Sequence, residues 1–368
     1  MMIETATKEK IFSVASMFLL GSVPTKLEEC KVGHINSTYF VTCENGEKYV
    51  LQNINTGIFK NPSGLMDNVV GVTDHIRKKI AEEGGDAERG TLSFCRSGNG
   101  KYFAFDEDGK CWRMYRYIDR VLNLQSAGSE KIFARVGKAF GHFQMQLADY
   151  DASVLCETIP NFHNTVSRYS DFERAVADDT AGRAKKVAKE IAFVREHKDV
   201  CAFIVDRIAS GVLPLRVTHN DTKLNNILID EASGEPLCVI DLDTIMPGSV
   251  LYDFGDAIRF GASSAAEDET DLDKVYMRTD MFDAFASGFI AGLEGSLSEE
   301  EILDLPMGAV IITLETGIRF LIDYLNGDTY FRTGYQEHNL DRARNQFKLV
   351  SYMEENISVM NGIVKKYL

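Results

Sequence analysis

One segment near the middle of the chain constrains the fold more than any other. It reads Val217-Thr-His-Asn-Asp-Thr-Lys-Leu-Asn-Asn-Ile-Leu-Ile-Asp-Glu-Ala-Ser-Gly-Glu-Pro-Leu-Cys-Val-Ile-Asp-Leu-Asp243. Two apolar runs in it, residues 226–230 and 237–241, flank a polar loop and predict two antiparallel strands. If these strands pair symmetrically, residue 226 lies opposite residue 241, with the side chains about 5 Å apart. An amide and a carboxylate then share one end of the hairpin.

The polar stretch that enters this hairpin has the spacing of a phosphoryl-transfer site. His219-x-Asp221-x-x-x-x-Asn226 matches the catalytic loop of kinases, in which the aspartate addresses the attacking hydroxyl and the asparagine takes a metal ion. The oxygens of Asn226 and Asp241 suit Mg²⁺, which prefers one or two carboxylates together with nucleotide phosphates. Asp243 is a candidate further metal ligand, since it points to the same face as Asp241 if the strand continues.

Phosphoryl transfer also needs a cation beside the oxygens of the moving group. Lys223 follows Asp221 by two residues and is placed to reach the γ-phosphate; the alternative is an ordinary solvated lysine. His219 is predicted to be a buried scaffold residue rather than a base. Asp253-Phe-Gly repeats the metal-binding tripeptide of protein kinases, but it lies outside the hairpin. We therefore assign the metal to Asp241, and we predict that Asp253 is structural and hydrogen-bonds the catalytic loop.

The pattern of the chain changes near residue 118. Before it, Asn45-Gly46 and Asp108-Gly109 are hairpin signals, and one helix is expected over residues 65–83. The expected strands cover residues 38–42, 48–52, 101–105 and 110–118. The expected helices after residue 118 cover 130–148, 172–197, 281–291, 307–325 and 342–368, interrupted by one strand pair. We expect an α+β fold with a small antiparallel-sheet lobe, residues 1–118, and a larger, mainly helical lobe, residues 119–368.

The N-terminal region contains a short apolar stripe. Ile11, Val14, Ala15, Phe18 and Leu19 have the spacing of an amphipathic helix. This spacing predicts a packed helix that remains in the mature protein rather than a signal sequence. No run reaches the roughly 20 apolar residues of a membrane span, and we expect a cytoplasmic protein.

Composition argues against several classes of function. The chain has 40 Lys and Arg against 55 Asp and Glu, a net charge of −15, which disfavours nucleic-acid and membrane partners. Its seven cysteines are scattered without a Cys-x-x-Cys pair, so reduced thiols are expected rather than a disulfide framework or a zinc site. The sequence contains no Gly-x-x-x-x-Gly-Lys-Ser/Thr, Gly-x-Gly-x-x-Gly or Gly-x-Ser-x-Gly motif. P-loop kinases, dehydrogenases and hydrolases therefore lose support.

The motifs resemble those of the aminoglycoside phosphotransferase and choline kinase superfamily, which implies a bilobal protein-kinase-like fold. Within it, the chain is similar to the N-acetylhexosamine 1-kinases, which phosphorylate the anomeric hydroxyl of N-acetylglucosamine and N-acetylgalactosamine with ATP. The Thr-Lys-Leu-Asn-Asn form of the catalytic loop favours this sugar family. The likeness is carried by residues 33–39, 49–55, 217–228, 240–249, 252–256, 258–263, 317–321 and 338–342.

The resemblance implies roles for nucleotide-binding residues. Asp221 becomes the catalytic base or hydroxyl-orienting carboxylate, with Mg²⁺ held as described above. The turn that contains His34 and Asn36 stands where kinases fold a loop over the phosphates, and Tyr117 lies in the expected adenine-reading hinge. Gln52 stands where kinases place a phosphate-anchoring lysine. Arg113 or His34 is then left to supply that cation.

The resemblance also implies a sugar site in the larger lobe, where polar groups and an aromatic face are needed. The candidates are Arg319, Asp323, Tyr324 and Tyr330, with Asp221 at the reacting hydroxyl and His34 entering from the smaller lobe. Arg319 and Asp323 are neighbours one helical turn apart, so an ordinary surface ion pair is the alternative for this arginine.

Two other functions stay open at this stage. The acid-rich stretch of residues 267–304 would attract a cationic acceptor, which favours aminoglycoside or choline phosphorylation. Gln52 in place of a lysine would fit a nucleotide-binding pseudokinase. The leading hypothesis remains an ATP- and Mg²⁺-dependent N-acetylhexosamine 1-kinase that transfers the phosphoryl group directly.

Overall fold

The computed structural model describes residues 5–30, 36–124 and 128–368, and its contacts divide the chain into two units. The first unit comprises Met1–Leu122, Val154–Pro160 and Leu228–Ile245. The second unit comprises Asn123–Ser153, Asn161–Ile227 and Met246–Leu368. The first unit thus includes two segments from beyond residue 118, the boundary expected from the sequence.

A five-stranded antiparallel sheet with the order β1-β2-β3-β5-β4 forms the centre of the first unit. Its strands are β1 (Pro24–Cys30), β2 (Ser37–Cys43), β3 (Lys48–Ile54), β4 (Ala104–Phe105) and β5 (Cys111–Arg116). Both predicted turns are confirmed. Gly46 connects β2 to β3 and Gly109 connects β4 to β5, each with a positive φ, 87° and 75°, that suits glycine.

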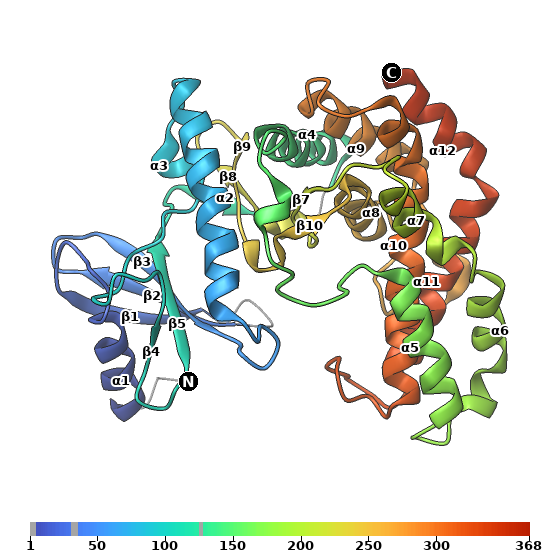
Figure 1. Cartoon of the computed structure of the whole chain (residues 1–368), viewed down its shortest axis with the longest axis horizontal. Coiled ribbons are helices and arrows are strands. Elements are labelled where there is room, and N and C mark those ends of the chain that lie inside the picture. The colour runs from blue at the N-terminus through green and yellow to red at the C-terminus, as the bar shows by residue number, and fades with distance from the viewer. Residues whose placement is uncertain (1–4, 31–35, 125–127) are drawn as a thin grey trace. The chain divides into compact units, whose positions relative to one another are not determined.

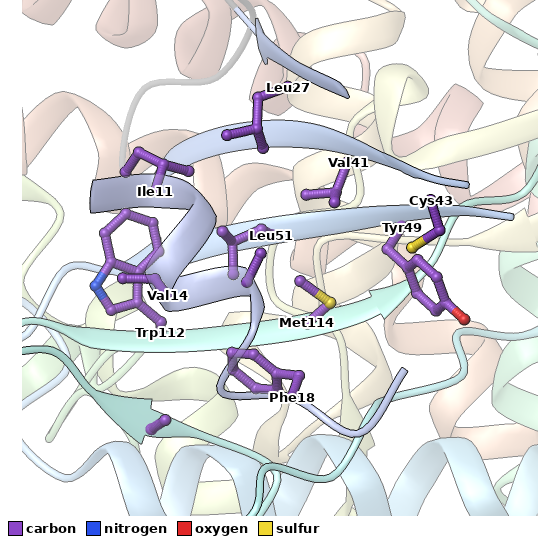
Figure 2. Packing of buried hydrophobic residues seen from close by; sticks show 12 residues of the cluster. Ile11, Val14, Phe18, Leu27, Val41, Cys43, Tyr49, Leu51, Trp112 and Met114 are labelled. Carbon is purple, nitrogen blue, oxygen red and sulfur yellow. The ribbon is translucent and has the colours of Figure 1, made fainter. Parts of the chain in front are cut away.

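The N-terminal helix α1 (Thr5–Ala15) covers one face of this sheet (Figure 1). Figure 2 shows Ile11, Val14 and Phe18 against the sheet. Leu19 departs from the predicted stripe and is 67% exposed. The helix ends at Ala15, and the Leu19 N–H donates to the Arg96 carbonyl instead of continuing a helix. The buried core contains Ile11, Val14, Ala15, Phe18, Leu27, Val41, Cys43, Tyr49, Leu51, Ala104, Trp112 and Met114.

Helix α2 (Pro62–Glu82) fixes the later segments of the first unit. Asn61 caps its N-terminus, because the Asn61 side chain accepts a hydrogen bond from the Gly64 N–H, and a proline lies in the first turn. Its buried Asn68 donates to the carbonyls of Cys156 and Ile245, at 2.8 and 2.9 Å. Because these bonds satisfy buried backbone groups, they tie both segments to α2. The short helix α3 (Ala87–Gly90) follows.

The predicted hairpin forms, with a register that differs from the symmetric one. Its strands are β8 (Ile227–Asp230) and β9 (Pro236–Val239), and β6 (Val121–Asn123) joins β8. The Asp230 N–H donates to the Glu235 carbonyl, whereas symmetric pairing would set Asp230 against Leu237. The loop is shorter than expected, because the Asp230 carboxylate accepts from the backbone of Ala232 and Ser233 and closes it early.

The second strand of the hairpin also ends earlier than predicted. β9 stops at Val239, and Asp241 adopts a left-handed conformation with φ 61° and ψ 55°. A 3-10 turn, Leu242–Thr244, follows. The condition for placing Asp243 on the same strand face as Asp241 is therefore not met. Asp243 is instead buried by the turn, while Asp241 is exposed.

The second unit is mainly helical. Its elements are α4 (Glu130–Gln146), α5 (Thr165–Asp178), α6 (Ala188–Glu196), α7 (Phe203–Ala209), β7 (Arg216–Thr218), β10 (Met246–Gly248), α8 (Val250–Gly261), α9 (Thr279–Gly292), α10 (Glu299–Leu325), α11 (His338–Glu355) and α12 (Ile357–Val364). The single helix predicted over 172–197 is two helices, because Asp179 and Gly182 between them have positive φ. The β7–β10 strand pair and α8 were not predicted. Helix α8 is buried all round from Val250 to Arg259, so it shows no polar face to reveal its period.

Helix α10 (Glu299–Leu325) is longer than the helix predicted over residues 307–325. Its length and composition fit a membrane span, but 78% of its most apolar window is buried inside the fold. Burial of this kind is typical of the core helix of a globular protein, which passes the same test of length and composition.

Glycines allow two pairs of helices to touch backbone to backbone. On α4 and α9, a Cβ added at Gly288 would lie 1.9 Å from the Ala134 carbonyl oxygen, and one at Gly141 would lie 2.1 Å from that of Phe289. On α8 and α10, a Cβ at Gly255 would lie 2.3 Å from the Gly308 oxygen. Helix α8 can therefore pack closely on the core helix α10 (Figure 1).

Candidate active site

The loop after β7 is held by a buried carboxylate on α8. Asp253 accepts the N–H groups of His219 at 2.9 Å and Asn220 at 2.7 Å, and the Gln144 amide at 2.6 Å. Thr222 donates its hydroxyl to the Asp253 carbonyl at 2.5 Å. Burial raises the pKa of Asp253, although His219 and these donors oppose the shift. Asp253 thus hydrogen-bonds the loop, which is the structural role proposed for it from the sequence.

His219 lies in the scaffold beneath the loop. It is fully buried, and its ring meets Phe140 and Phe143 edge-on, with centroids 5.9 and 6.0 Å away. Its Nδ1 accepts the Asp221 N–H at 3.3 Å. The ring therefore supports the backbone of Asp221 and does not reach outward as a base.

Asp221, Lys223 and Asn226 meet in the second unit. The Lys223 ammonium lies 2.6 Å from the Asp221 carboxylate. The Asn226 amide donates to the Asp221 carbonyl at 2.7 Å and to its carboxylate at 3.2 Å. Burial lowers the pKa of Lys223, but Asp221 and Asp256 outweigh it and raise that pKa above its ordinary value. Lys223 is therefore a charged partner of Asp221 rather than a freely solvated lysine.

The predicted metal ligands have suitable chemistry. Asn226 is 5% exposed, and the two bonds from its amide nitrogen fix its orientation. Asp241 combines an exposed carboxylate with a left-handed backbone, a strained conformation often found at functional sites. Among the residues that the structure describes, no three His, Cys, Asp or Glu side chains gather to hold an ion. Mg²⁺, the ion expected from the sequence, takes few protein ligands and completes its shell with phosphates and water.

A polar network replaces the usual lysine in the sheet of the first unit. Register places Gln52 of β3 between Thr38 of β2 and Arg113 of β5. The Gln52 side-chain oxygen accepts two bonds from the Arg113 guanidinium, at 3.0 and 2.8 Å. The same guanidinium forms an ion pair with Asp243. Asn36 donates to the Asp243 carboxylate at 2.6 Å.

This network engages two residues predicted to contact nucleotide or metal. Arg113 and Asp243 are only 3% and 4% exposed, so the pair is desolvated on both sides. Burial lowers the pKa of Arg113, but Asp243 outweighs it and raises that pKa. Asp243 is thus primarily the counter-ion of Arg113 in this structure. Of the two candidates for the phosphate cation, Arg113 is held in this pair and His34 lies outside the described residues.

Replacing Arg113 tests how much its ion pair with Asp243 contributes to the stability of the fold. Arg113→Met is expected to lower the free energy of unfolding by about 3–5 kcal/mol, because it leaves the Asp243 carboxylate buried without a counter-ion. Urea denaturation measures the change. The matched control is Arg174→Met, which breaks an exposed pair with Asp171 and should cost under about 1 kcal/mol. Equal losses in the two variants would contradict a buried, coupled pair.

Tyr117 follows the end of β5 and is 37% exposed. Its ring meets Phe40 edge-on at 5.5 Å, and the Lys48 ammonium lies 5.8 Å from the ring centroid. Its N–H donates to the Lys48 carbonyl, which fixes the segment expected to read the adenine edge.

Three of the predicted sugar residues of the second unit, Arg319, Tyr324 and Tyr330, have different surroundings. The Arg319 guanidinium lies between the rings of Phe162 and Phe331, 5.4 and 5.6 Å from their centroids. Tyr330 is 61% exposed in the loop after α10. Tyr324 is only 2% exposed and lies under the Arg183 guanidinium, so its ring offers no open face to a sugar and we reassign it to the core.

The alternative ion pair between Arg319 and Asp323 is not found among the described residues. Asp323 is 3% exposed, and its carboxylate accepts backbone N–H groups of the loop after α10. The donors are Thr329, Tyr330 and Phe331, together with the Asn339 side chain. Asp323 therefore shapes the loop that carries Tyr330 and leaves Arg319 without this carboxylate.

Sequence reasoning missed two buried polar pairs in the second unit. His163 pairs with Glu315 at 2.9 Å, and Asp256 pairs with Arg259 at 3.0 Å. Glu315 lies one helical turn before Arg319 on α10, and Asp256 directly follows the Asp253-Phe-Gly tripeptide. Their closeness in sequence to Arg319 and to this tripeptide was the signal that could have identified Glu315 and Asp256. No short motif surrounds His163.

Comparisons with known proteins bear on the family and the fold of this chain. Residues 26–277 match the model of a family described as the phosphotransferase enzyme family. A microcompartment-associated aminopropanol kinase has a similar structure, with a TM-score of 0.58 and 13% identity over 95% of this chain and 98% of that one. An amicoumacin kinase in complex with AMP-PNP and Ca²⁺ gives a TM-score of 0.58 and 15% identity, with 96% of each chain covered.

A choline/ethanolamine kinase family protein from Mesorhizobium loti gives a TM-score of 0.55 and 18% identity over 98% of this chain and 99% of that one. At such identities the likeness shows the fold. The predicted class is confirmed: a kinase-like α+β fold with an antiparallel sheet in the N-terminal region and helices in the C-terminal part.

Proposed function

Because this chain belongs to the phosphotransferase enzyme family, we propose that it is a small-molecule kinase that phosphorylates the anomeric hydroxyl of N-acetylhexosamines with ATP. The observation that carries the proposal is the loop in which Asp221, Lys223 and Asn226 meet over the Asp253 anchor. A carboxylate, an ammonium and a metal-binding amide at this spacing are the groups that phosphoryl transfer requires.

Each residue of the loop has a distinct part in the proposed reaction. Asp221 orients the acceptor hydroxyl and takes its proton as the new oxygen–phosphorus bond forms and the bond to ADP breaks. Lys223 brings positive charge to the oxygens of the moving group. Asn226 and Asp241 would hold Mg²⁺, which supplies further positive charge to the phosphates when bound. We propose direct transfer, since the acceptor hydroxyl itself is the nucleophile.

The sugar assignment is supported by the surroundings of Arg319. Its guanidinium is held by two aromatic rings and lacks the predicted Asp323 partner, and Tyr330 is exposed nearby in sequence. Such an arrangement suits a ligand with both hydroxyl groups and an apolar ring face.

The runner-up is a cationic acceptor such as choline or an aminoglycoside. The net charge of −15 favours it, and so do relatives described as choline and aminoglycoside kinases. However, much of the acid-rich stretch is already neutralised within the fold. Its ion pairs are Glu267–Arg259, Asp271–Lys274, Asp280–Arg278, Asp283–Lys366, Glu301–Arg216 and Asp304–Arg207. This pairing weakens the attraction for a cation that the sequence suggested.

A product assay separates these possibilities. The protein is incubated with ATP, Mg²⁺ and either N-acetylglucosamine or N-acetylgalactosamine, and ³¹P NMR is expected to show an anomeric 1-phosphate. Choline and kanamycin serve as competing acceptors under the same conditions. A phosphate on another hydroxyl would reject the regiochemistry, and faster turnover of choline would reject the sugar assignment. A protein that turned over none of these acceptors would favour the pseudokinase hypothesis.

A further inference from the structure

Several buried polar atoms of the second unit have no hydrogen-bond partner in the described part of the chain, and two of them lie close to the loop anchor and to Arg319. They are Nε2 of His163 and Oδ2 of Asp256. Each side chain is only 8% exposed. Buried polar groups are nearly always paired, because an unpaired one loses its hydration without compensation. Two such atoms beside the proposed reaction centre therefore suit a ligand that supplies hydrogen-bond donors.

The orientation of the His163 ring is fixed by Glu315. Nδ1 of His163 lies 2.9 Å from one Glu315 oxygen, and the Thr165 hydroxyl donates to the other at 3.0 Å. Burial raises the pKa of Glu315, but His163 and nearby arginines outweigh it and lower that pKa, so the carboxylate stays ionised at neutral pH. An ionised carboxylate only accepts, so Nδ1 must carry the hydrogen. In the neutral ring, Nε2 then presents a lone pair.

Asp256 is held in a similar way by Arg259. Two guanidinium nitrogens donate to the same oxygen, Oδ1, at 3.2 and 3.0 Å, which leaves Oδ2. Arg259 also pairs with Glu267 at 2.6 Å. Burial raises the pKa of Asp256, but Arg259 and Lys223 outweigh it and lower that pKa, so the carboxylate stays ionised and its second oxygen can only accept a hydrogen bond.

Both atoms are linked to the proposed reaction centre. Asp256 lies one turn after the loop anchor Asp253 on α8, and the Lys223 ammonium acts electrostatically on it. The His163 ring packs on Tyr252, with centroids 4.9 Å apart. The neighbouring residue Phe162 lies under Arg319. The pair is thus connected by packing to the loop anchor and to Arg319.

We propose that His163 and Asp256 bind two hydroxyl groups of the acceptor other than the one that is phosphorylated. This inference rests on the proposed function and narrows it to a polyhydroxylated acceptor. Two buried atoms that accept no hydrogen bond within the described part of the chain complement a ligand that offers two O–H groups. Choline has a single hydroxyl, which the reaction consumes, so it leaves both atoms unpaired.

Steady-state kinetics of the full-length protein tests the proposal. His163→Asn keeps an amide near Glu315 but removes the atom at the Nε2 position, so the KM for the amino sugar is expected to rise about 10-fold. The KM for ATP and kcat should change little. His163→Gln, whose amide reaches the Nε2 position, should restore much of the affinity. The matched control is His197→Asn, since His197 also pairs with a glutamate, Glu354, but both its nitrogens have partners.

Acceptors that each lack one hydroxyl extend the test without changing the protein. With the unmodified protein, one deoxy analogue should have a KM that is higher by about the same factor. His163→Asn should not raise the KM for this analogue any further. For a second deoxy analogue, Asp256→Asn should likewise not raise the KM further. If the Asp256→Asn variant does not fold, the higher KM of this analogue with the unmodified protein reports on Asp256.

The outcomes separate this inference from the proposed function. If His163→Asn lowers the melting temperature without changing the acceptor KM, the group has only a structural role and the inference fails. If kanamycin replaces the amino sugars as acceptor and its KM rises in His163→Asn, the proposed function fails and the inference holds. If choline is the acceptor, both fail.

Discussion

Asp221→Asn is expected to lower kcat by about 10²–10⁴-fold, the largest kinetic effect predicted for this protein. The amide keeps the size of the side chain but neither takes a proton nor attracts Lys223, which lies 2.6 Å away in the unmodified protein. The KM for ATP should change much less, because nucleotide binding does not depend on the proton acceptor. Single-turnover kinetics with ATP and the preferred acceptor measures the chemical step directly.

A matched variant separates this effect from a general loss of folding. Asp74→Asn removes an exposed carboxylate of α2 and should leave kcat unchanged. Both variants should melt within a few degrees of the parent protein, since Asp221 is partly exposed and anchors no backbone group through its carboxylate. An Asp221→Asn protein with full activity would show that the catalytic role is misassigned.

Gly288→Ala is expected to cause the largest loss of stability. The added methyl group would lie 1.9 Å from the Ala134 carbonyl oxygen, and backbone atoms cannot turn aside as a side chain can. The α4 and α9 helices must therefore separate, at a cost of about 3 kcal/mol or more in the free energy of unfolding. Denaturant unfolding followed by circular dichroism measures the loss.

The control for this substitution is another helical glycine. Gly362 of α12 has open space where its Cβ would lie, so Gly362→Ala should stabilise the protein by about 0.5–1 kcal/mol through helix propensity. Opposite signs for the two substitutions would establish that close helix approach, rather than glycine content, decides the outcome. A Gly288→Ala protein as stable as its parent would contradict the backbone contact.

The parts of the fold that follow from local chemistry were predictable from the sequence. The turns at Gly46 and Gly109 need only a residue that tolerates positive φ, and the sequence places glycine there. Helix α8 was missed for the converse reason, because its burial on all sides depends on distant helices. The early end of β9 at Val239 was missed as well, since left-handed Asp241 has no distinctive sequence pattern.

The same distinction between local and long-range contacts applies to the candidate site. Asp221, Lys223 and Asn226 lie within one loop, so their spacing alone brings them together. The contacts of Arg113 with Asp243 and of His163 with Glu315 join residues more than a hundred positions apart, which a single sequence does not reveal. Tyr324 and Tyr330 show the limit most clearly. They are close neighbours in sequence, yet one faces the helix core and the other is exposed.

The place of Gln52 has an evolutionary consequence. Its side-chain oxygen receives two hydrogen bonds from Arg113, so these two positions are chemically complementary. A change of Gln52 to lysine, the residue common at this place in kinases, would put two cations face to face in a buried site. Arg113 would have to change first, or in the same step. The two positions are therefore expected to show epistasis: if an ancestor carried the usual lysine and the two residues changed one at a time, the intermediate carried either neither cation or both.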